Sequence, residues 1–380
     1  MDLEPIINEL TTSVISAFAV RGPHLREKDC ICEMGKKGWD HFCSPWAAPA
    51  EQLLRFEGHF CDAQPLGVCY GRNGNNLPSS QDVVNLYKAN GITNMRVYDP
   101  IPETLNALKG SNISIILDIS NDNLQSFSTD PKAAENWVIA NIKSYFPQVK
   151  FKYISVGNEV SPKNVGTSQF VPFVLPALRN VQQAITKFRM QNQVKATTMI
   201  DTGLLTNTYP PAKSVFSDDV TSFINPIIGF LKQNNLPLLA NIYPYYGYIG
   251  NPDQVPLPYA LFTQKKPDPT GYHNLFDAML DATYYAVEKA GGDNVQIVVA
   301  ESGWPSDGGF GASMKNAGTY YRNLISHVKL GAGTPHKPEK AIETYLFAMF
   351  DENIKIGAET EKYFGVFHPD KTQKYNLTFN

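Results

Sequence analysis

Two glutamates, Glu159 and Glu301, each follow directly after a short apolar run, in the segments Lys152–Val160 and Gln296–Pro305. Cleavage of a glycosidic bond with retention needs two carboxyl groups about 5 to 5.5 Å apart, one to protonate the leaving oxygen and one to attack the anomeric carbon. Opposed strands of one barrel can bring two such residues together. The residues alone assign neither role, and a solvated salt-bridge partner is the alternative for each glutamate.

The elements that must position these glutamates follow one another regularly. Short apolar or β-branched runs alternate with segments of helical period, which is typical of β–α units around a parallel sheet. Eight such units predict an α/β fold of the TIM (β/α)8 barrel type, in which the loops after the strands form the active face. The expected strands are 66–70, 94–98, 114–119, 153–156, 194–199, 238–243, 296–300 and 342–347. The expected helices are 80–89, 131–145, 172–189, 219–234, 274–290 and 314–328.

The chain of 380 residues divides unevenly. No Gly/Ser-rich or charge-run linker interrupts residues 67–380, and one barrel domain is expected over residues 64–380. Residues 1–63 are expected to form an atypical N-terminal extension, either poorly ordered or an altered signal region. They start with the acidic residues Asp2 and Glu4, and their apolar run Val14–Val20 is short, so no secretory signal is recognisable.

Composition narrows the class of partner. With a formal net charge of -3 and 18% charged residues, the chain shows no sign of a broad basic surface for nucleic acid or anionic membrane. A neutral substrate fits better. No apolar stretch approaches the roughly 20 residues that a membrane helix needs, so no membrane span is expected.

Neither a metal nor another cofactor is expected. No His/Asp/Glu ligand cluster and no glycine-rich phosphate loop stands at an expected strand end. Four of the five cysteines lie in the extension, where a C-x-C pair and two histidines imitate a zinc cluster without matching an ordinary finger. These extension residues are Cys30, Cys32, His41, Cys43, His59 and Cys61.

Several spaced motifs, in order, resemble those of the plant endo-1,3-beta-glucanases, from about residue 67 to the C-terminus. The resemblance implies a glycoside hydrolase that cleaves internal linkages of 1,3-beta-glucans, such as callose or fungal wall glucan, by retaining double displacement. It further implies Glu159 as the acid/base, Glu301 as the nucleophile, and a role in cell-wall remodelling or pathogen defence. The motifs are Gly67–Gly71, Arg96–Pro100, Val156–Val160, Ala240–Tyr245 and Val299–Ser306.

The same resemblance implies supporting residues. Asn158 would hold the sugar 2-hydroxyl, while Arg96 and Tyr243 would donate to the nucleophile. The alternatives are an arginine that pairs with a buried acid and a tyrosine that fills the core. A later segment similar to the family contributes a lysine between two carboxylates, with a surface ion-pair cluster as the alternative. Its three residues are Glu352, Lys355 and Glu361.

Aromatic residues at or just beyond the expected strand ends could stack on sugar rings, although such residues are also ordinary barrel core. Trp304 is the strongest stacking candidate. The proline- and tyrosine-rich segment 245–272 is expected to wall an extended open cleft, which favours internal cleavage. The residues expected to bind substrate are Tyr98, Tyr245, Tyr246, Trp304, Phe310 and Phe350.

Localisation and specificity stay less defined. An extracellular monomer of the apoplast or cell wall is expected, with the vacuole as the alternative, because vacuolar members of the family carry an extension beyond Asn380. The sequons at Asn112 and Asn376 matter only if the chain enters the secretory route. Two rival functions remain: a mixed-linkage 1,3-1,4-beta-glucanase with the same carboxylates, and a glucan-binding barrel without turnover.

Overall fold

The computed structural model describes residues 66–379. The predictions for the N-terminal extension, including its zinc-like cysteines and histidines, lie outside the described residues. None of the helices between residues 66 and 379 is both long and apolar enough to cross a lipid bilayer.

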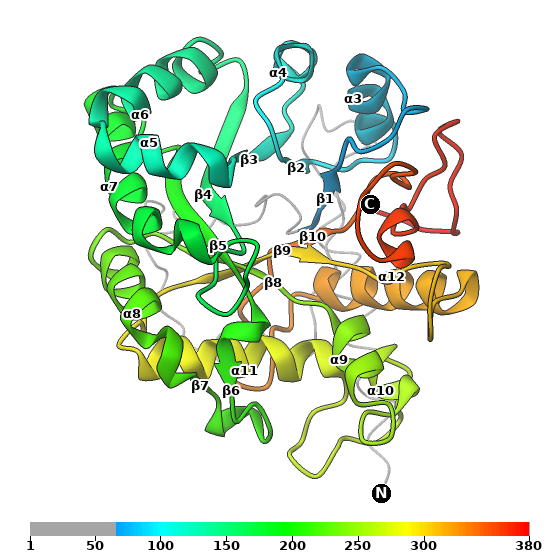
Figure 1. Ribbon diagram of the computed structural model, residues 1–380. Coiled ribbons are helices and arrows are strands. Elements are labelled where there is room, and N and C mark those ends of the chain that lie inside the picture. The colour runs from blue at the N-terminus through cyan, green and yellow to red at the C-terminus, as the bar shows by residue number, and fades with distance from the viewer. Residues whose placement is uncertain (1–65, 380) are drawn as a thin grey trace, which may run out of the picture. The chain divides into compact units, whose positions relative to one another are not determined.

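Eight parallel strands close into a barrel in the order β1-β10-β9-β8-β5-β4-β3-β2, which confirms the predicted TIM barrel (Figure 1). Each strand lies at a predicted position. Strand β4 begins earlier than predicted, because Lys150 and Phe151 already pair with β3. The strands are β1 (Leu66–Tyr70), β2 (Asn94–Val97), β3 (Ser114–Ile119), β4 (Lys150–Asn158), β5 (Lys195–Asp201), β8 (Leu238–Asn241), β9 (Ile297–Ser302) and β10 (Thr344–Leu346).

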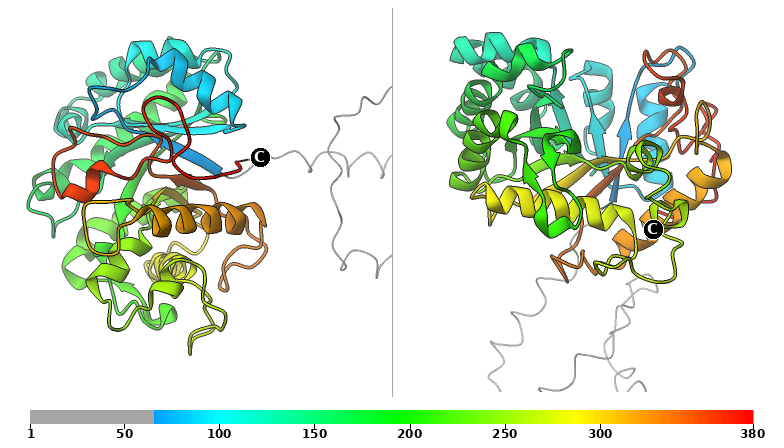
Figure 2. Two further views of the ribbon diagram at one scale, coloured as in Figure 1. Left: turned by 90° about the vertical axis from the view of Figure 1, so that its right-hand side faces the viewer. Right: turned by 60° about the horizontal axis from the view of Figure 1, so that its bottom comes forward.

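Helices surround the barrel, and Figure 2 shows α11 and α12 lying across its outer side. Side chains cap two of these helices at their N-termini: the Ser79 hydroxyl accepts a hydrogen bond from the Asp82 N–H, and the Asp130 carboxylate accepts one from the Lys132 N–H. The predicted helices correspond to α3 (Ser80–Ala89), α6 (Pro131–Val138), α7 (Val171–Lys187), α8 (Asp218–Gln233), α11 (Leu275–Lys289) and α12 (Met314–Lys329).

Several elements were not predicted. After α6 the chain continues as a π-helical turn, Ile139–Lys143, in place of the longer α-helix. The loop after β5 carries a small antiparallel hairpin of β6 (Leu205–Thr206) and β7 (Val215–Phe216). The remaining helices are short: α4 (Pro102–Leu108), α5 (Leu124–Thr129), α9 (Pro244–Gly250) and α10 (Leu257–Ala260).

Strand register sets the level of the polar residues at the top of the barrel. Strands β1 and β9 are buried along their whole length, as expected for a parallel sheet covered by helices. At the carboxyl end of the sheet, Asp201 of β5 pairs with Asn241 of β8, and Asn241 pairs with Glu301 of β9. Beyond the end of β4, the Glu159 N–H donates to the carbonyl of Met199 in β5. Both glutamates therefore stand at the same end of the barrel.

Candidate active site

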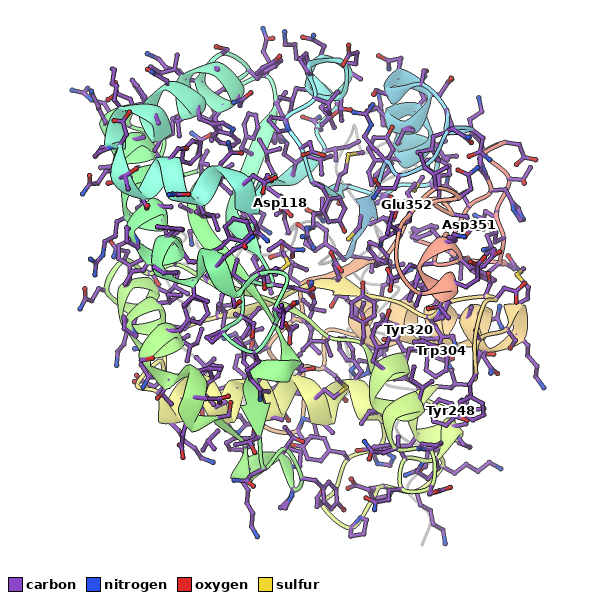
Figure 3. All side chains as sticks on the ribbon, in the orientation of Figure 1. Asp118, Tyr248, Trp304, Tyr320, Asp351 and Glu352 are labelled. Carbon is purple, nitrogen blue, oxygen red and sulfur yellow. The ribbon has the colours of Figure 1, made fainter. Side chains whose placement is uncertain are left out.

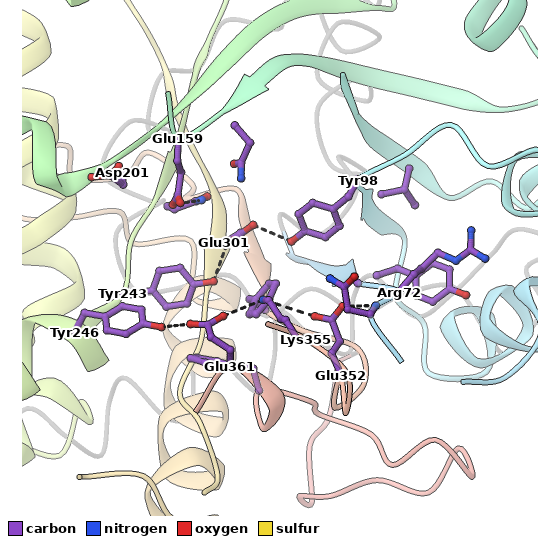
Figure 4. Close-up of a pocket in the computed structure, with 18 of the residues that line it drawn as sticks. Arg72, Tyr98, Glu159, Asp201, Tyr243, Tyr246, Glu301, Glu352, Lys355 and Glu361 are labelled. Carbon is purple, nitrogen blue, oxygen red and sulfur yellow. Dashed lines mark hydrogen bonds and ion pairs between the residues drawn. The ribbon is translucent and has the colours of Figure 1, made fainter. Parts of the chain in front are cut away.

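A cavity of about 790 Å³ opens where the strands end, and both Glu159 and Glu301 line it (Figure 4). Nine predicted site residues meet there, although they come from distant parts of the chain. Arg96 lies beneath the cavity, fully buried. The predicted residues that line the cavity are Tyr98, Asn158, Glu159, Tyr243, Tyr246, Glu301, Glu352, Lys355 and Glu361.

Glu301, at the end of β9, receives donors on both carboxylate oxygens. The Tyr243 hydroxyl donates to Oε2 at 2.6 Å, and the Tyr98 hydroxyl donates to Oε1 at 2.8 Å. The Arg96 guanidinium forms a buried ion pair with Oε1 through Nη1. Together these donors stabilise a negative charge on Glu301.

Arg96 is held in place by a second buried carboxylate. Its Nη2 lies 2.6 Å from Asp118 Oδ2, and the same nitrogen donates to Asn158 Oδ1 at 3.1 Å. Burial raises the pKa of Asp118, although Arg96 acts in the opposite direction. The predicted donor to Glu301 and the alternative pairing with a buried acid therefore occur together in one arginine.

The backbone at the end of β4 turns sharply to present Glu159. Gly157 and Glu159 have φ angles of 80° and 50°, and left-handed backbone is unfavourable for a glutamate. Asn121 holds the turn, because its Oδ1 accepts from the Asn158 N–H at 2.9 Å and its Nδ2 donates to the Asn158 carbonyl at 3.0 Å. A strained residue kept at a cavity wall in this way is typical of a functional site.

Glu159 has an environment opposite to that of Glu301. Its carboxylate accepts a hydrogen bond from Asn241 Nδ2 at 2.7 Å, and no cation pairs with it among the described residues. Burial and then the negative charge of Glu301 raise the pKa of Glu159 to about 7, while Asn241 acts in the opposite direction. One carboxyl can thus hold a proton near neutral pH beside another whose charge is stabilised, a pairing suited to acid and nucleophile roles.

The predicted lysine and its two carboxylates gather at the rim of the cavity (Figure 4). Lys355 Nζ lies 2.9 Å from Glu361 Oε2 and 3.7 Å from Glu352 Oε2. The Tyr246 hydroxyl donates to Glu361 at 2.5 Å, which connects this rim to helix α9. These residues form an ion-pair network, in which Lys355 also lies over the ring of Phe347. They make no hydrogen bond or ion pair with Glu159 or Glu301 in the described part of the chain.

The aromatic predictions need correction. Trp304 is fully buried, its indole N–H donates to the Gly311 carbonyl at 3.0 Å, and its ring packs between Tyr248 and Tyr320 (Figure 3). The indole is thus held by the loop after β9, through Gly311, and covered by Tyr248 of α9. Burial makes three predicted sugar-stacking residues part of the core instead: Trp304, Tyr245 and Phe350.

Phe310 takes an intermediate position. Its side chain is 63% exposed and stacks on Tyr248 at a centroid distance of 5.6 Å, but it does not line the cavity. Of the six predicted substrate-binding aromatics, Tyr98 and Tyr246 do line it.

Sequence reasoning missed three polar residues: Asp118, Asp201 and Asn241. Asp118 is a charged residue among the apolar residues of β3, and this position could have marked it as a candidate. Asp201 and Asn241 end two strands, so the rule that selected Glu159 could have found them too. Cys69 is buried and unpaired, and burial raises the pKa of its thiol. Between residues 66 and 379, no group of three or more His, Cys, Asp or Glu residues could hold a metal ion.

Known proteins are similar to this chain in fold and in sequence. The chain is 62% identical over 318 residues to an acidic isoform of glucan endo-1,3-beta-glucosidase from Nicotiana tabacum, covering 84% of this chain and 92% of the relative. Among solved structures, a beta-1,3-glucanase and pollen allergen of Cryptomeria japonica is 43% identical, with a TM-score of 0.81, over 83% of this chain and 99% of that one.

A second solved structure belongs to a study of two plant beta-glucan endohydrolases with distinct substrate specificities. It is 41% identical to this chain, with a TM-score of 0.77, over 82% of this chain and 100% of that one. Residues 66–379, which include the whole described barrel, match glycosyl hydrolases family 17. The chain therefore belongs to family 17 of the glycosyl hydrolases.

Proposed function

We propose that this chain hydrolyses internal 1,3-beta-glucosidic linkages by retaining double displacement, with Glu159 as the acid/base and Glu301 as the nucleophile. The observation that carries the proposal is the contrast between the two carboxyls of one cavity. Three donors stabilise the charge of Glu301, whereas the pKa of Glu159 is raised to about 7 by burial and by that same charge. The choice of the 1,3-beta linkage follows the names of the relatives, a glucan endo-1,3-beta-glucosidase and a beta-1,3-glucanase.

In the first displacement, Glu301 attacks the anomeric carbon while Glu159 gives its proton to the departing glycosidic oxygen. The sugar is then bound to Glu301 as an ester. The other part of the glucan, whose oxygen now carries the proton from Glu159, leaves the site. In the second displacement, Glu159 takes a proton from water, and that water attacks the same carbon from the side of the departed chain. The released sugar keeps its β configuration.

Neighbouring residues have supporting roles in this reaction. Arg96, Tyr98 and Tyr243 stabilise the charge that returns to Glu301 when the ester is hydrolysed. Asn158 accepts from Arg96 through Oδ1, which orients its amide and leaves Nδ2 available for the sugar 2-hydroxyl. The Lys355 network holds Glu352 and Glu361 at the rim, where sugar hydroxyls of a neutral polymer can bind.

A mixed-linkage 1,3-1,4-beta-glucanase is the second candidate. It would use the same two carboxyls, and the solved structure that is 41% identical to this chain is described with two plant beta-glucan endohydrolases of distinct substrate specificities, so the barrel alone does not fix the linkage. A glucan-binding barrel without turnover is disfavoured by the different environments of the two glutamates, which binding alone does not require.

The test compares linear 1,3-beta-glucan with mixed-linkage glucan and follows both oligosaccharide release and its anomeric form. We expect β-anomeric oligosaccharides from the 1,3-glucan first, with each of Glu159→Gln and Glu301→Gln reducing the rate by orders of magnitude. Preferential cleavage of the mixed-linkage polymer would favour the second candidate. Tight binding without turnover by the unchanged protein would contradict both hydrolase proposals.

We also propose that residues 64–380 form the catalytic domain and that residues 1–63 are a separate extension. The family match over residues 66–379 supports this boundary. For localisation we propose an extracellular, monomeric protein of the apoplast or cell wall that acts in wall remodelling or defence, with the vacuole as the alternative. Asn112 and Asn376 of the two sequons are both exposed, as glycan attachment in a secreted protein would require.

A further inference from the structure

A third carboxylate lies in the same row of strand ends as the two glutamates. Asp201 ends β5, between the strand that carries Glu159 and the strand that carries Asn241. It pairs in register with Asn241, which is itself paired with Glu301. Figure 4 shows Asp201 beside Glu159 and on the side away from Glu301.

The two oxygens of Asp201 differ in their partners. Oδ1 accepts a hydrogen bond from the Gly203 N–H at 2.5 Å, which fixes the carboxylate on the short helical turn Thr202–Leu204. Oδ2 makes no hydrogen bond within residues 66–379, although the residue is half-buried. Asp201, Thr202 and Gly203 all line the cavity, so this oxygen is available to a ligand there.

The position of Asp201 indicates which part of a substrate it would meet. In the proposed reaction, Glu159 protonates the oxygen of the leaving sugar, and Glu301 attacks the carbon on the opposite side of that bond. The leaving glucosyl unit must therefore lie on the Glu159 side. Its hydroxyl groups are donors, and a carboxylate oxygen is a strong acceptor for them.

We propose that Asp201 binds a hydroxyl group of the leaving glucosyl unit through Oδ2 and that its negative charge helps Glu159 to keep its proton until that unit departs. This inference rests on the proposed function and adds a residue that acts on the leaving side of the cleaved bond. The same carboxylate thus joins binding of the departing sugar to the protonation of its oxygen.

The charges around Glu159 support this second role. Glu301 from β9 and Asp201 from β5 both favour the protonated form, whereas Arg96 from β2 and the Asn241 amide from β8 favour the carboxylate. Around Asp201 itself, burial raises the pKa, while the Gly203 N–H and the Lys163 cation lower it. Removal of the Asp201 charge should therefore let Glu159 lose its proton at a lower pH.

The experiment uses the full chain with Asp201→Asn, which keeps an oxygen to accept from the Gly203 N–H. We expect kcat/KM for 1,3-beta-glucan oligosaccharides to fall about tenfold, and the alkaline limb of its pH profile to move down by about half a pH unit. An aryl laminaribioside has no sugar hydroxyl on its leaving side, so its kcat/KM should change less than about twofold. The matched control is Asp122→Asn, which removes an exposed charge after β3 outside the cavity. It should leave kcat/KM unchanged for both substrates.

Equal losses on both substrates with an unmoved alkaline limb would overturn the inference, because a merely structural aspartate would behave in that way. If Asp201→Asn does not fold, Asp201→Ser removes the same charge while its hydroxyl can accept from Gly203. An unchanged protein that fails to cleave 1,3-beta-glucan would instead refute the proposed function. The two failures are therefore distinguishable in one set of assays.

Discussion

Asn241 offers a sharp test of how the proton on Glu159 is held. Its Nδ2 donates to Glu159 Oε1 at 2.7 Å, and the side chain is only 2% exposed. Its Oδ1 is buried and has no hydrogen-bond partner among the residues that the structure describes. Leucine is close to asparagine in shape and has no polar atoms, so Asn241→Leu removes the donation and the unsatisfied oxygen together.

The magnitude follows from the geometry. A hydrogen bond to a charged group contributes about 1.5 to 3 kcal/mol, and one pKa unit corresponds to about 1.4 kcal/mol. Because Glu159 lines a cavity open to solvent, we take the lower end of this range. The donation favours the carboxylate, so its loss should raise the pKa of Glu159 from about 7 by about one unit.

The assay is kcat/KM for a linear 1,3-beta-glucan oligosaccharide measured across the pH range. The acid must be protonated to act, so the alkaline limb of the wild-type profile should lie near 7 and that of Asn241→Leu about one unit higher. The melting temperature should not fall, because a buried oxygen without a partner is lost. An alkaline limb that stays in place or moves down in a folded variant would refute the reasoning. Asp201→Asn should move the same limb in the opposite direction.

Two further substitutions separate the site from the core. Tyr243→Phe removes the 2.6 Å donation to Glu301 but keeps the ring packed against Phe347, so kcat/KM should fall about 10- to 100-fold at unchanged melting temperature; an unchanged rate would contradict a role for this hydroxyl. Trp304→Phe should lower the free energy of unfolding by about 1 to 3 kcal/mol, measured with denaturant, and leave KM unchanged. A raised KM at full stability would restore Trp304 as a sugar-stacking residue.

The fold was predictable because its signals are local. Each barrel strand is an apolar run between helices, and helix starts such as Ser79 and Asp130 are marked by capping residues. The π-helical turn Ile139–Lys143 and the hairpin β6–β7 carry no comparable local signal. They depend on how neighbouring segments pack, which a single sequence does not display.

Two signals made part of the site predictable: the positions of the strand ends and the resemblance to a known family. Both place Glu159 and Glu301 at one end of the barrel, but neither reveals the register that puts Asp201 beside Asn241. Trp304 shows the opposite error, because a residue just beyond a strand end can still be covered by its own loop. Position along the chain predicts the face of the barrel, whereas exposure is decided by the loops that pack over that face.

Two residues of the same type behave differently here because the barrel supplies them with different neighbours. Arg96 and Tyr98 reach Glu301 from β2 and the loop after it, and Tyr243 reaches it from the loop after β8. Glu159 accepts a hydrogen bond from the Asn241 amide and faces the negative charge of Glu301, and that charge helps to keep Glu159 protonated. Loss of charge on Glu301, as in its proposed ester, removes that repulsion, and Glu159 then releases its proton more readily. The same pair can thus provide an acid for the first displacement and a base for the second.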